Sequence, residues 1–168
     1  MTDAAIRAAR RAVKQAGSRD PFRVARELDI DVLEEDFKQQ KGAFCMVEGY
    51  PFIFLNTHLG DAERIAVCAH ELGHALLHRA EAEKSMICEF DLYNMKTDIE
   101  YEANVFASEL LIDESDLTDV LTRGTDVYAA AKELGVNVNL LLIKLHEMNR
   151  RGCKYELPYL PYKAFMGE

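Results

Sequence analysis

The segment from about residue 62 to 79 constrains the fold most, because it places two imidazoles and a carboxylate where a metal ion and a water molecule could meet. Apolar residues recur along it at helical spacing, and Asp61 is predicted to cap the helix. On a helix, His70 and His74 lie about 40° apart around the axis and about 6 Å apart along it, so both can bind one ion. Glu71 would project beside that ion. The pattern therefore predicts zinc-assisted hydrolysis, in which Glu71 takes a proton from water.

A further metal ligand must come from elsewhere in the chain, because two histidines leave a catalytic zinc ion one protein ligand short. His78 lies two turns from His70, about 12 Å along the axis, which is too far for both to bind one ion. We expect His78 to pair with a carboxylate or to pack at the helix end. Gly73 weakens the helix, and it should allow either a close approach of backbone or ligand, or tight helix packing.

Two glutamates on the next long helix, Glu100 and Glu102, are the candidates for this ligand. Glu100 shares a face with small and apolar residues, which should turn inward toward the histidine helix. Glu102 shares its face with Glu109, and that face looks partly solvated. Helical phase therefore favours Glu100. Asn104 lies one turn beyond it and is expected to orient a ligating histidine from behind, or alternatively to make a hydrogen bond between helices.

The rest of the chain predicts an α+β fold, with a small three-stranded sheet packed on the histidine helix and a mainly helical C-terminal half. Two β-prone runs separated by Gly49-Tyr50 suit a hairpin, and a short strand precedes them. We expect helices near residues 3–16, 21–28, 98–112, 114–122, 126–134 and 138–150, and strands near 30–33, 42–48 and 51–56. Residues 80–97 should form a loop or a short helix. The proline-broken tail at 155–162 should pad the surface or, less favoured, lie in the cleft.

Length and composition predict a single globular domain, because 168 residues with 49% hydrophobic side chains can build a real core. We expect this domain to span residues 1–168, with the N-terminal helices, sheet and active-site helix in 1–79, the helical half in 98–152 and an irregular tail in 153–168. The cysteines fall at wide spacings without a C-x-x-C pair, and we expect them to be buried apolar fillers: Cys45, Cys68, Cys88 and Cys153.

The charge balance and the absence of long apolar runs limit the partners. A net charge of −9 repels phosphates, so direct binding of nucleic acid is not expected. No window approaches the roughly eighteen apolar residues of a membrane span, and the first residues lack the pattern of a signal peptide. We therefore expect a cytoplasmic protein that does not enter a membrane.

Several motifs together resemble the ImmA/IrrE metallopeptidases over about residues 20 to 112. The resemblance is carried by the run from Gly42 through the hairpin, by Asn56, Arg64, His70-Glu71-Leu72-Gly73-His74 and Leu77-His78, and by Glu100-x-x-Ala103-Asn104-x-Phe106-Ala107-x-x-Leu110-Leu111. The family often has a proline after the Leu-Leu pair, where this chain has Ile112-Asp113; that difference affects a helix end and no metal ligand.

This resemblance implies a zincin-like fold of the gluzincin kind and one zinc ion on His70, His74 and Glu100. It also implies that Glu71 is the general base of a peptidase. Members of the family cut, or help to remove, helix-turn-helix transcription repressors, often in phages and mobile elements. A repressor is therefore the expected protein partner.

Two other functions compete with peptide hydrolysis. The chain could contain zinc and bind or sequester a repressor without efficient proteolysis, since an acidic surface suits a basic partner in either case. Residues 126–149 also have the spacing of a helix-turn-helix, but the second helix is so apolar that it looks suited to packing rather than to reading DNA.

Peptide hydrolysis would also need a surface that holds the substrate and a group that stabilises the oxyanion. An edge strand, near residues 44–48 or 52–55, is expected to hold an extended substrate by strand addition. Four side chains could donate to the oxyanion, and the sequence does not choose among Tyr93, Tyr101, His58 and His146.

Overall fold

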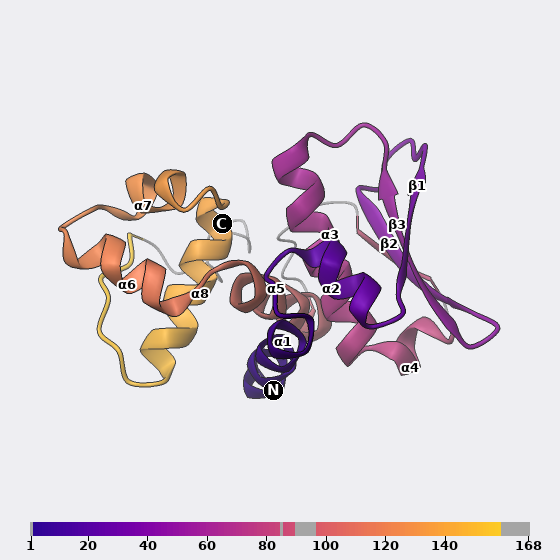
Figure 1. Ribbon diagram of the computed structural model, residues 1–168, viewed down its shortest axis with the longest axis horizontal. Helices are drawn as coiled ribbons and strands as arrows, with labels where there is room; N and C mark the ends of the chain where they lie inside the picture. Colours follow the sequence, from indigo (N-terminus) through magenta and orange to yellow (C-terminus); the bar gives the residue numbers. More distant parts are fainter. Residues whose placement is uncertain (1, 85, 90–96, 159–168) are drawn as a thin grey trace.

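The computed structural model describes residues 2–84, 86–89 and 97–158, and Figure 1 shows their arrangement. The fold is α+β, as predicted, with a sheet on one side of the molecule, a group of helices on the other and long helices between them. The helices are α1 (Thr2–Ala16), α2 (Pro21–Glu27), α3 (Asp61–Leu77), α4 (Arg79–Ala82), α5 (Asp98–Leu111), α6 (Glu114–Thr122), α7 (Val127–Glu133) and α8 (Val138–Arg150). The strands are β1 (Asp31–Glu35), β2 (Gly42–Val47), β3 (Tyr50–Asn56) and β4 (Ile87–Glu89). Across the described ranges, no helix is long and apolar enough to cross a membrane.

The sheet contains the three predicted strands and a short fourth one, in the order β1-β3-β2-β4. β3 runs parallel to β1 and antiparallel to β2. The hairpin turns at Glu48 and Gly49, whose φ angles of 50° and 86° are the left-handed values that a tight two-residue turn requires. β4 pairs antiparallel with β2, in a stretch that was expected to be a loop or short helix. Residues 90–96 of that stretch lie outside the described part of the chain.

The prediction that β2 or β3 is the edge strand that holds a substrate was wrong. β3 is paired on both sides, and β4 covers the other side of β2 along residues 42–44. The edges of the described sheet are therefore β1 and β4. Hydrophobic pattern identifies strands, but their order depends on contacts between distant segments, which the pattern does not encode.

α3 lies between the sheet and α5 and forms the centre of the core. Val67 and Leu72 of α3 are fully buried, as are Phe44, Ile53 and Leu55 of the sheet. Burying an aliphatic or aromatic side chain of this size contributes about 1.5–3 kcal/mol relative to exposure. This packing holds the histidine-bearing helix firmly on the sheet, as the sequence predicted.

Two glycines allow unusually close approaches to α3. A Cβ atom added at Gly73 would lie 2.9 Å from the Cα atom of Ala103 on α5. Gly73 therefore serves tight helix packing, one of the two roles expected for it. A Cβ atom at Gly42, the first residue of β2, would lie 2.6 Å from Val67 Cγ1 and 2.9 Å from Glu71 Oε1. A larger residue would require the backbone of α5 to shift at Gly73 and the side chains of Val67 and Glu71 to shift at Gly42.

The helices α6, α7 and α8 lie on the side of α5 that faces away from the sheet (Figure 1). Residues 140–145 of α8 are all buried, and the Lys144 ammonium is 2.5 Å from the carboxylate of Glu109 on α5. Arg10 of α1 pairs with the same carboxylate at 2.7 Å. α8 is thus a packing helix, and the Lys144 side chain is engaged inside the protein rather than exposed to a nucleic acid.

Three local predictions were wrong. Asp61 is the first residue of α3, and Gly60 is the N-cap. The Asp61 carboxylate in the first turn still stabilises the helix by its attraction to the positive end of the helix dipole. Glu109, expected on a partly solvated face, is buried because Lys144 compensates its charge. Cys153 is exposed because it lies in the segment beyond the last helix, whereas the other cysteines with described side chains are buried.

Candidate metal centre

His70, His74 and Glu100 meet between α3 and α5. The two imidazole Nε2 atoms lie 3.1 Å apart. Glu100 Oε2 lies 3.2 Å from His70 Nε2 and 3.6 Å from His74 Nε2. The structure therefore brings the three predicted ligands together, with donor atoms that all lie within 4.8 Å of one another.

The spacing of these donor atoms suits a zinc ion. Ligand atoms about 2.0–2.1 Å from a tetrahedral zinc ion would lie about 3.3 Å from one another. The distances of 3.1, 3.2 and 3.6 Å between the three atoms fall on both sides of that value. Imidazole nitrogen and carboxylate oxygen are also donors that zinc accepts. The residues present thus fit an ion of this size and preference.

Helix geometry explains why these side chains converge. A spacing of four residues puts both histidines on one face of α3. At Gly73 the backbones of α3 and α5 come so close that there is no room for a Cβ atom beside Ala103. Glu100 lies nearly one turn before Ala103, so it is close to this point of contact. The side chain of Thr97 caps α5 by accepting a hydrogen bond from the backbone N–H of Glu100. The cap therefore fixes the first turn of α5, where the carboxylate begins.

Burial and the contacts between the side chains set the pKa values of His74 and Glu100. His70 and His74 are each 1% exposed. Burial lowers the pKa of His74 to about 4, although the neighbouring Glu100 carboxylate opposes this shift, so this imidazole is neutral at pH 7. Burial alone would raise the pKa of Glu100, but the His70 and His74 side chains beside it outweigh burial and lower that pKa. Neutral nitrogen and ionised oxygen are the forms that bind a divalent cation.

Asn104 lies directly behind His70. Its Oδ1 atom is 3.1 Å from His70 Nδ1, and the whole residue is buried. An amide oxygen can only accept, so His70 Nδ1 carries the hydrogen, and the lone pair of the neutral ring is on Nε2. This contact is also a hydrogen bond between two helices, so the two roles expected for Asn104 coincide.

His78 lies behind His74 and is buried at the C-cap of α3. Its Nδ1 atom is 3.0 Å from His74 Nδ1, and its Nε2 atom is 3.2 Å from Glu102 Oε2. The expected pairing of His78 with a carboxylate is thus present. The helical distance from His70 had placed His78 outside the metal site, although the spacing of four residues between His74 and His78 was a usable signal for their contact.

Glu71 is fully buried on α3, one residue after the first histidine. Its side chain lies over the start of β2, because Gly42 has no side chain to exclude it. The carboxylate is therefore held between the helix and the sheet, beside the His-His-Glu cluster in sequence. A carboxylate in this position can accept a proton from water and return it to a leaving group.

Two of the side chains considered for the oxyanion make other contacts in the structure. The Tyr101 hydroxyl donates to Glu147 at 2.7 Å, which directs it toward α8. The His58 ring lies on the surface, 2.8 Å from Asp36. Tyr93 lies outside the described residues. The assignment of an oxyanion donor therefore stays open.

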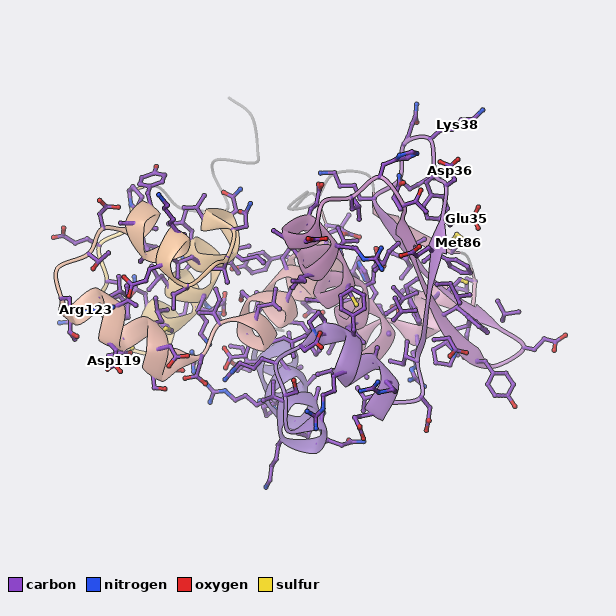
Figure 2. The ribbon with its side chains drawn as sticks, turned by 45° about the horizontal axis from the view of Figure 1, so that its top comes forward. Glu35, Asp36, Lys38, Met86, Asp119 and Arg123 are labelled. Atoms are coloured by element: carbon purple, nitrogen blue, oxygen red, sulfur yellow. The ribbon has the colours of Figure 1, made fainter. Side chains whose placement is uncertain are left out.

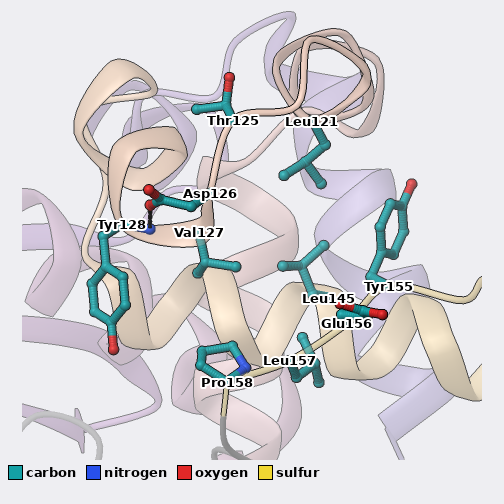
Figure 3. A pocket seen from close by; sticks show the side chains of 10 residues that line it. All are labelled: Leu121, Thr125, Asp126, Val127, Tyr128, Leu145, Tyr155, Glu156, Leu157 and Pro158. Atoms are coloured by element: carbon teal, nitrogen blue, oxygen red, sulfur yellow. Dashed lines mark hydrogen bonds between the residues drawn. The ribbon is translucent and has the colours of Figure 1, made fainter.

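Two hollows lie away from the cluster. A cavity of about 480 Å³ is bordered by α6, α7, α8 and the C-terminal segment, whose Tyr155 and Leu157 line it (Figure 3). Asn149 holds this segment by hydrogen bonds of 2.9 and 2.8 Å to the backbone of Tyr155. A groove of about 880 Å³ runs between the start of α3 and the α7–α8 turn. The described part of the tail, residues 153–158, thus pads the helical half, as expected, and residues 159–162 lie outside the described chain.

Charged side chains cover both ends of the molecule. Figure 2 shows Glu35, Asp36 and Lys38 near the sheet, and Asp119 and Arg123 at the opposite end. Glu35 and Asp36 are exposed and continue the acidic edge strand β1. With a net charge of −9, the surface favours a basic partner over an acidic one.

Two comparisons with known proteins show what the chain is similar to. Residues 25–146 match the family Peptidase_M78, described as the IrrE N-terminal-like domain, and this range includes all the predicted site residues. The chain is also 34% identical over 106 residues to a protein of Bacillus phage phi105 named "Uncharacterized immunity region protein 2". That similarity covers 62% of this chain and 66% of the phage protein, just under two thirds of its length.

Proposed function

The chain belongs to the Peptidase_M78 family of metallopeptidases, and from this premise we propose that it is a zinc-dependent endopeptidase that cleaves a helix-turn-helix transcription repressor. Its α+β architecture is the zincin-like fold of that family. The observation that carries the proposal is the convergence of His70, His74 and Glu100, with Glu71 on the same helix as the histidines.

In this proposal each side chain has a separate task. His70, His74 and Glu100 would hold one zinc ion, which would supply Lewis acidity to a water molecule and to the scissile carbonyl group. Asn104 keeps His70 in the tautomer whose Nε2 lone pair faces the site. Glu71 accepts a proton from the water at its carboxylate and delivers that proton to the leaving amine.

The substrate class is proposed from the relative and from charge. The phage relative is named as an immunity region protein, and the ImmA/IrrE metallopeptidases that this chain resembles act on helix-turn-helix repressors. A DNA-binding repressor is basic, so it complements a chain with a net charge of −9. A repressor acts in the cytoplasm, so its cleavage would take place there.

The sheet offers a place for the substrate backbone. β4 pairs with residues 42–44, so it lies next to the strand that contacts Glu71. On the side of β4 that faces away from β2, no described strand pairs with its backbone. We propose that an extended substrate segment adds to this edge by β-augmentation, which would bring a peptide bond toward the metal.

The decisive experiment compares the wild type with Glu71→Gln. Each purified protein receives one equivalent of Zn²⁺ and is incubated with the helix-turn-helix repressor encoded nearest to its gene. We expect the wild type to fragment the repressor and Glu71→Gln to bind zinc without cutting. Glu81→Gln on α4 is the matched control, because the same change there should leave cleavage unaffected.

Two outcomes would contradict the proposal. A Glu71→Gln protein that still cuts the repressor would remove the assigned base. A wild-type protein that binds the repressor and protects it, without fragments at any zinc concentration, would favour sequestration instead. Metal analysis of His74→Ala completes the test, since this variant should retain no stoichiometric zinc.

A further inference from the structure

The buried contacts behind His74 form a continuous chain that no part of the proposed peptide chemistry yet uses. It runs from His74 on α3 through His78 at the end of the same helix to Glu102 on α5. The distance is 3.0 Å from His74 Nδ1 to His78 Nδ1 and 3.2 Å from His78 Nε2 to Glu102 Oε2. His74 and His78 are 1% and 3% exposed, so water does not compete freely for these nitrogens.

The direction of each hydrogen bond follows from what the atoms can do. The Glu102 carboxylate can only accept, so His78 Nε2 carries a hydrogen and donates it. A His78 ring that carries only this hydrogen has a bare Nδ1 atom, which can only accept. His74 Nδ1 must therefore carry a hydrogen and donate it to His78. The remaining lone pair of a neutral His74 is on Nε2, the atom that faces His70 and Glu100.

We infer that Glu102 and His78 are positioning residues, which together set the tautomer and the ring orientation of His74 for metal binding. The inference rests on the proposed function for the identity of the metal site, and it adds two residues to it. His70 and His74 are then oriented by different side chains. The Asn104 amide contacts the His70 ring, whereas the His78 imidazole, itself hydrogen-bonded to a carboxylate, contacts the His74 ring. Both sets of contacts bridge α3 and α5.

Two substitutions of His78 separate its role as a hydrogen-bond acceptor from its role in filling space. An asparagine at position 78 offers an amide oxygen near the place of the imidazole Nδ1 atom, and this oxygen accepts from His74 without any help from Glu102. A leucine at position 78 fills similar space but accepts nothing. Glu102 should therefore matter only while a histidine at position 78 needs its own tautomer fixed.

The test measures metal binding and its spectrum, so it does not depend on peptidase activity. The full chain is titrated with Co²⁺, whose visible absorption reports the ligand geometry, and Zn²⁺ affinity is measured by competition with a chromophoric chelator. The variants are His78→Leu, His78→Asn, Glu102→Leu and the double variant His78→Asn/Glu102→Leu. His58→Leu is the matched control, because that exposed histidine contacts Asp36 on the surface.

We expect His78→Leu and Glu102→Leu to weaken Zn²⁺ binding by about tenfold to a hundredfold, the range seen when outer partners of a metal ligand are lost. Both should also shift the Co²⁺ absorption bands. His78→Asn should restore affinity to within about threefold of the wild type. In the His78→Asn background, adding Glu102→Leu should change neither affinity nor spectrum. His58→Leu should resemble the wild type throughout.

Two results overturn the inference while leaving the proposed metal site intact. One is a His78→Leu protein with the affinity and Co²⁺ spectrum of the wild type. The other is a Glu102→Leu change that weakens binding equally in both backgrounds, which would mean a general structural effect. If His78→Leu fails to fold, the comparison of Glu102→Leu in the two backgrounds still decides. A wild type that binds no metal, or binds it equally after His74→Ala, overturns the proposed function and this inference together.

Discussion

Gly73→Ala tests whether the spacing between α3 and α5 sets the metal site. The added Cβ would lie 2.9 Å from Ala103 Cα, and ordinary contact begins at 3.4 Å, so α5 must retreat by about 0.5 Å. Overpacking of this kind costs about 1–3 kcal/mol, but replacing glycine inside a helix returns about 1 kcal/mol. The net loss of folding stability should be about 0–2 kcal/mol. Glu100 lies on the retreating helix, nearly one turn before the contact.

The effect on the metal should exceed the effect on folding. Metal–ligand distances tolerate deviations of about 0.2 Å, so a displacement of about 0.5 Å should weaken Zn²⁺ binding at least tenfold, or about 1.4 kcal/mol. Zinc competition with a chelator measures the affinity, and a thermal melt in EDTA measures the folding loss. Gly60→Ala is the matched control, because no atom lies within 4 Å of a Cβ atom there. If Gly73→Ala binds Zn²⁺ as tightly as Gly60→Ala, helix spacing does not control the site.

Four further outcomes are expected. Gly42→Ala should crowd Glu71 and lower repressor cleavage at least tenfold at unchanged Zn²⁺ affinity, measured on the same preparation. Zn²⁺ at about a thousandfold above its Kd should raise the melting temperature by about 8–16 °C in the wild type, and calorimetry should show no such rise in His74→Ala. Lys144→Met should cost about 3–5 kcal/mol in urea unfolding, because Glu109 then stays buried with one cationic partner fewer. Burial would raise the pKa of Glu109, but Lys144 and Arg10 outweigh it and lower that pKa. The ionised carboxylate therefore stabilises the fold above its ordinary pKa, and this contribution disappears as pH falls through the folded pKa; the difference in unfolding free energy between wild type and Glu109→Gln should shrink accordingly below about pH 4.

Local pattern predicted the elements and the cluster of ligand candidates, because both depend on spacing along one helix or strand. The two histidines share a face of α3 by periodicity alone, and Glu100 was distinguished from Glu102 by helical phase. The sequence could not predict β4, because a three-residue strand forms only where a neighbouring strand offers an open edge.

Long-range polar contacts were also out of reach of local pattern. Glu109 looked like a surface residue, since nothing near it in sequence announces that Lys144 of a distant helix enters the core to meet it. The same holds for the contact between His78 and Glu102, which requires the relative placement of α3 and α5. A charged residue becomes acceptable in a core only through its partner, and partners are a property of the tertiary structure.

The burial of α5 has a consequence for anyone who designs fragments of this protein. Residues 103–110 of this helix are all buried. The helix carries the proposed ligand Glu100 in its first turn, and it packs between α3 and α8. A fragment that ends after Ile112 would retain every proposed metal ligand, yet it would remove the packing of α8 against α5 and deprive Glu109 of its lysine partner. Such a fragment should aggregate, so a minimal metal-binding unit requires the helices through α8 as well.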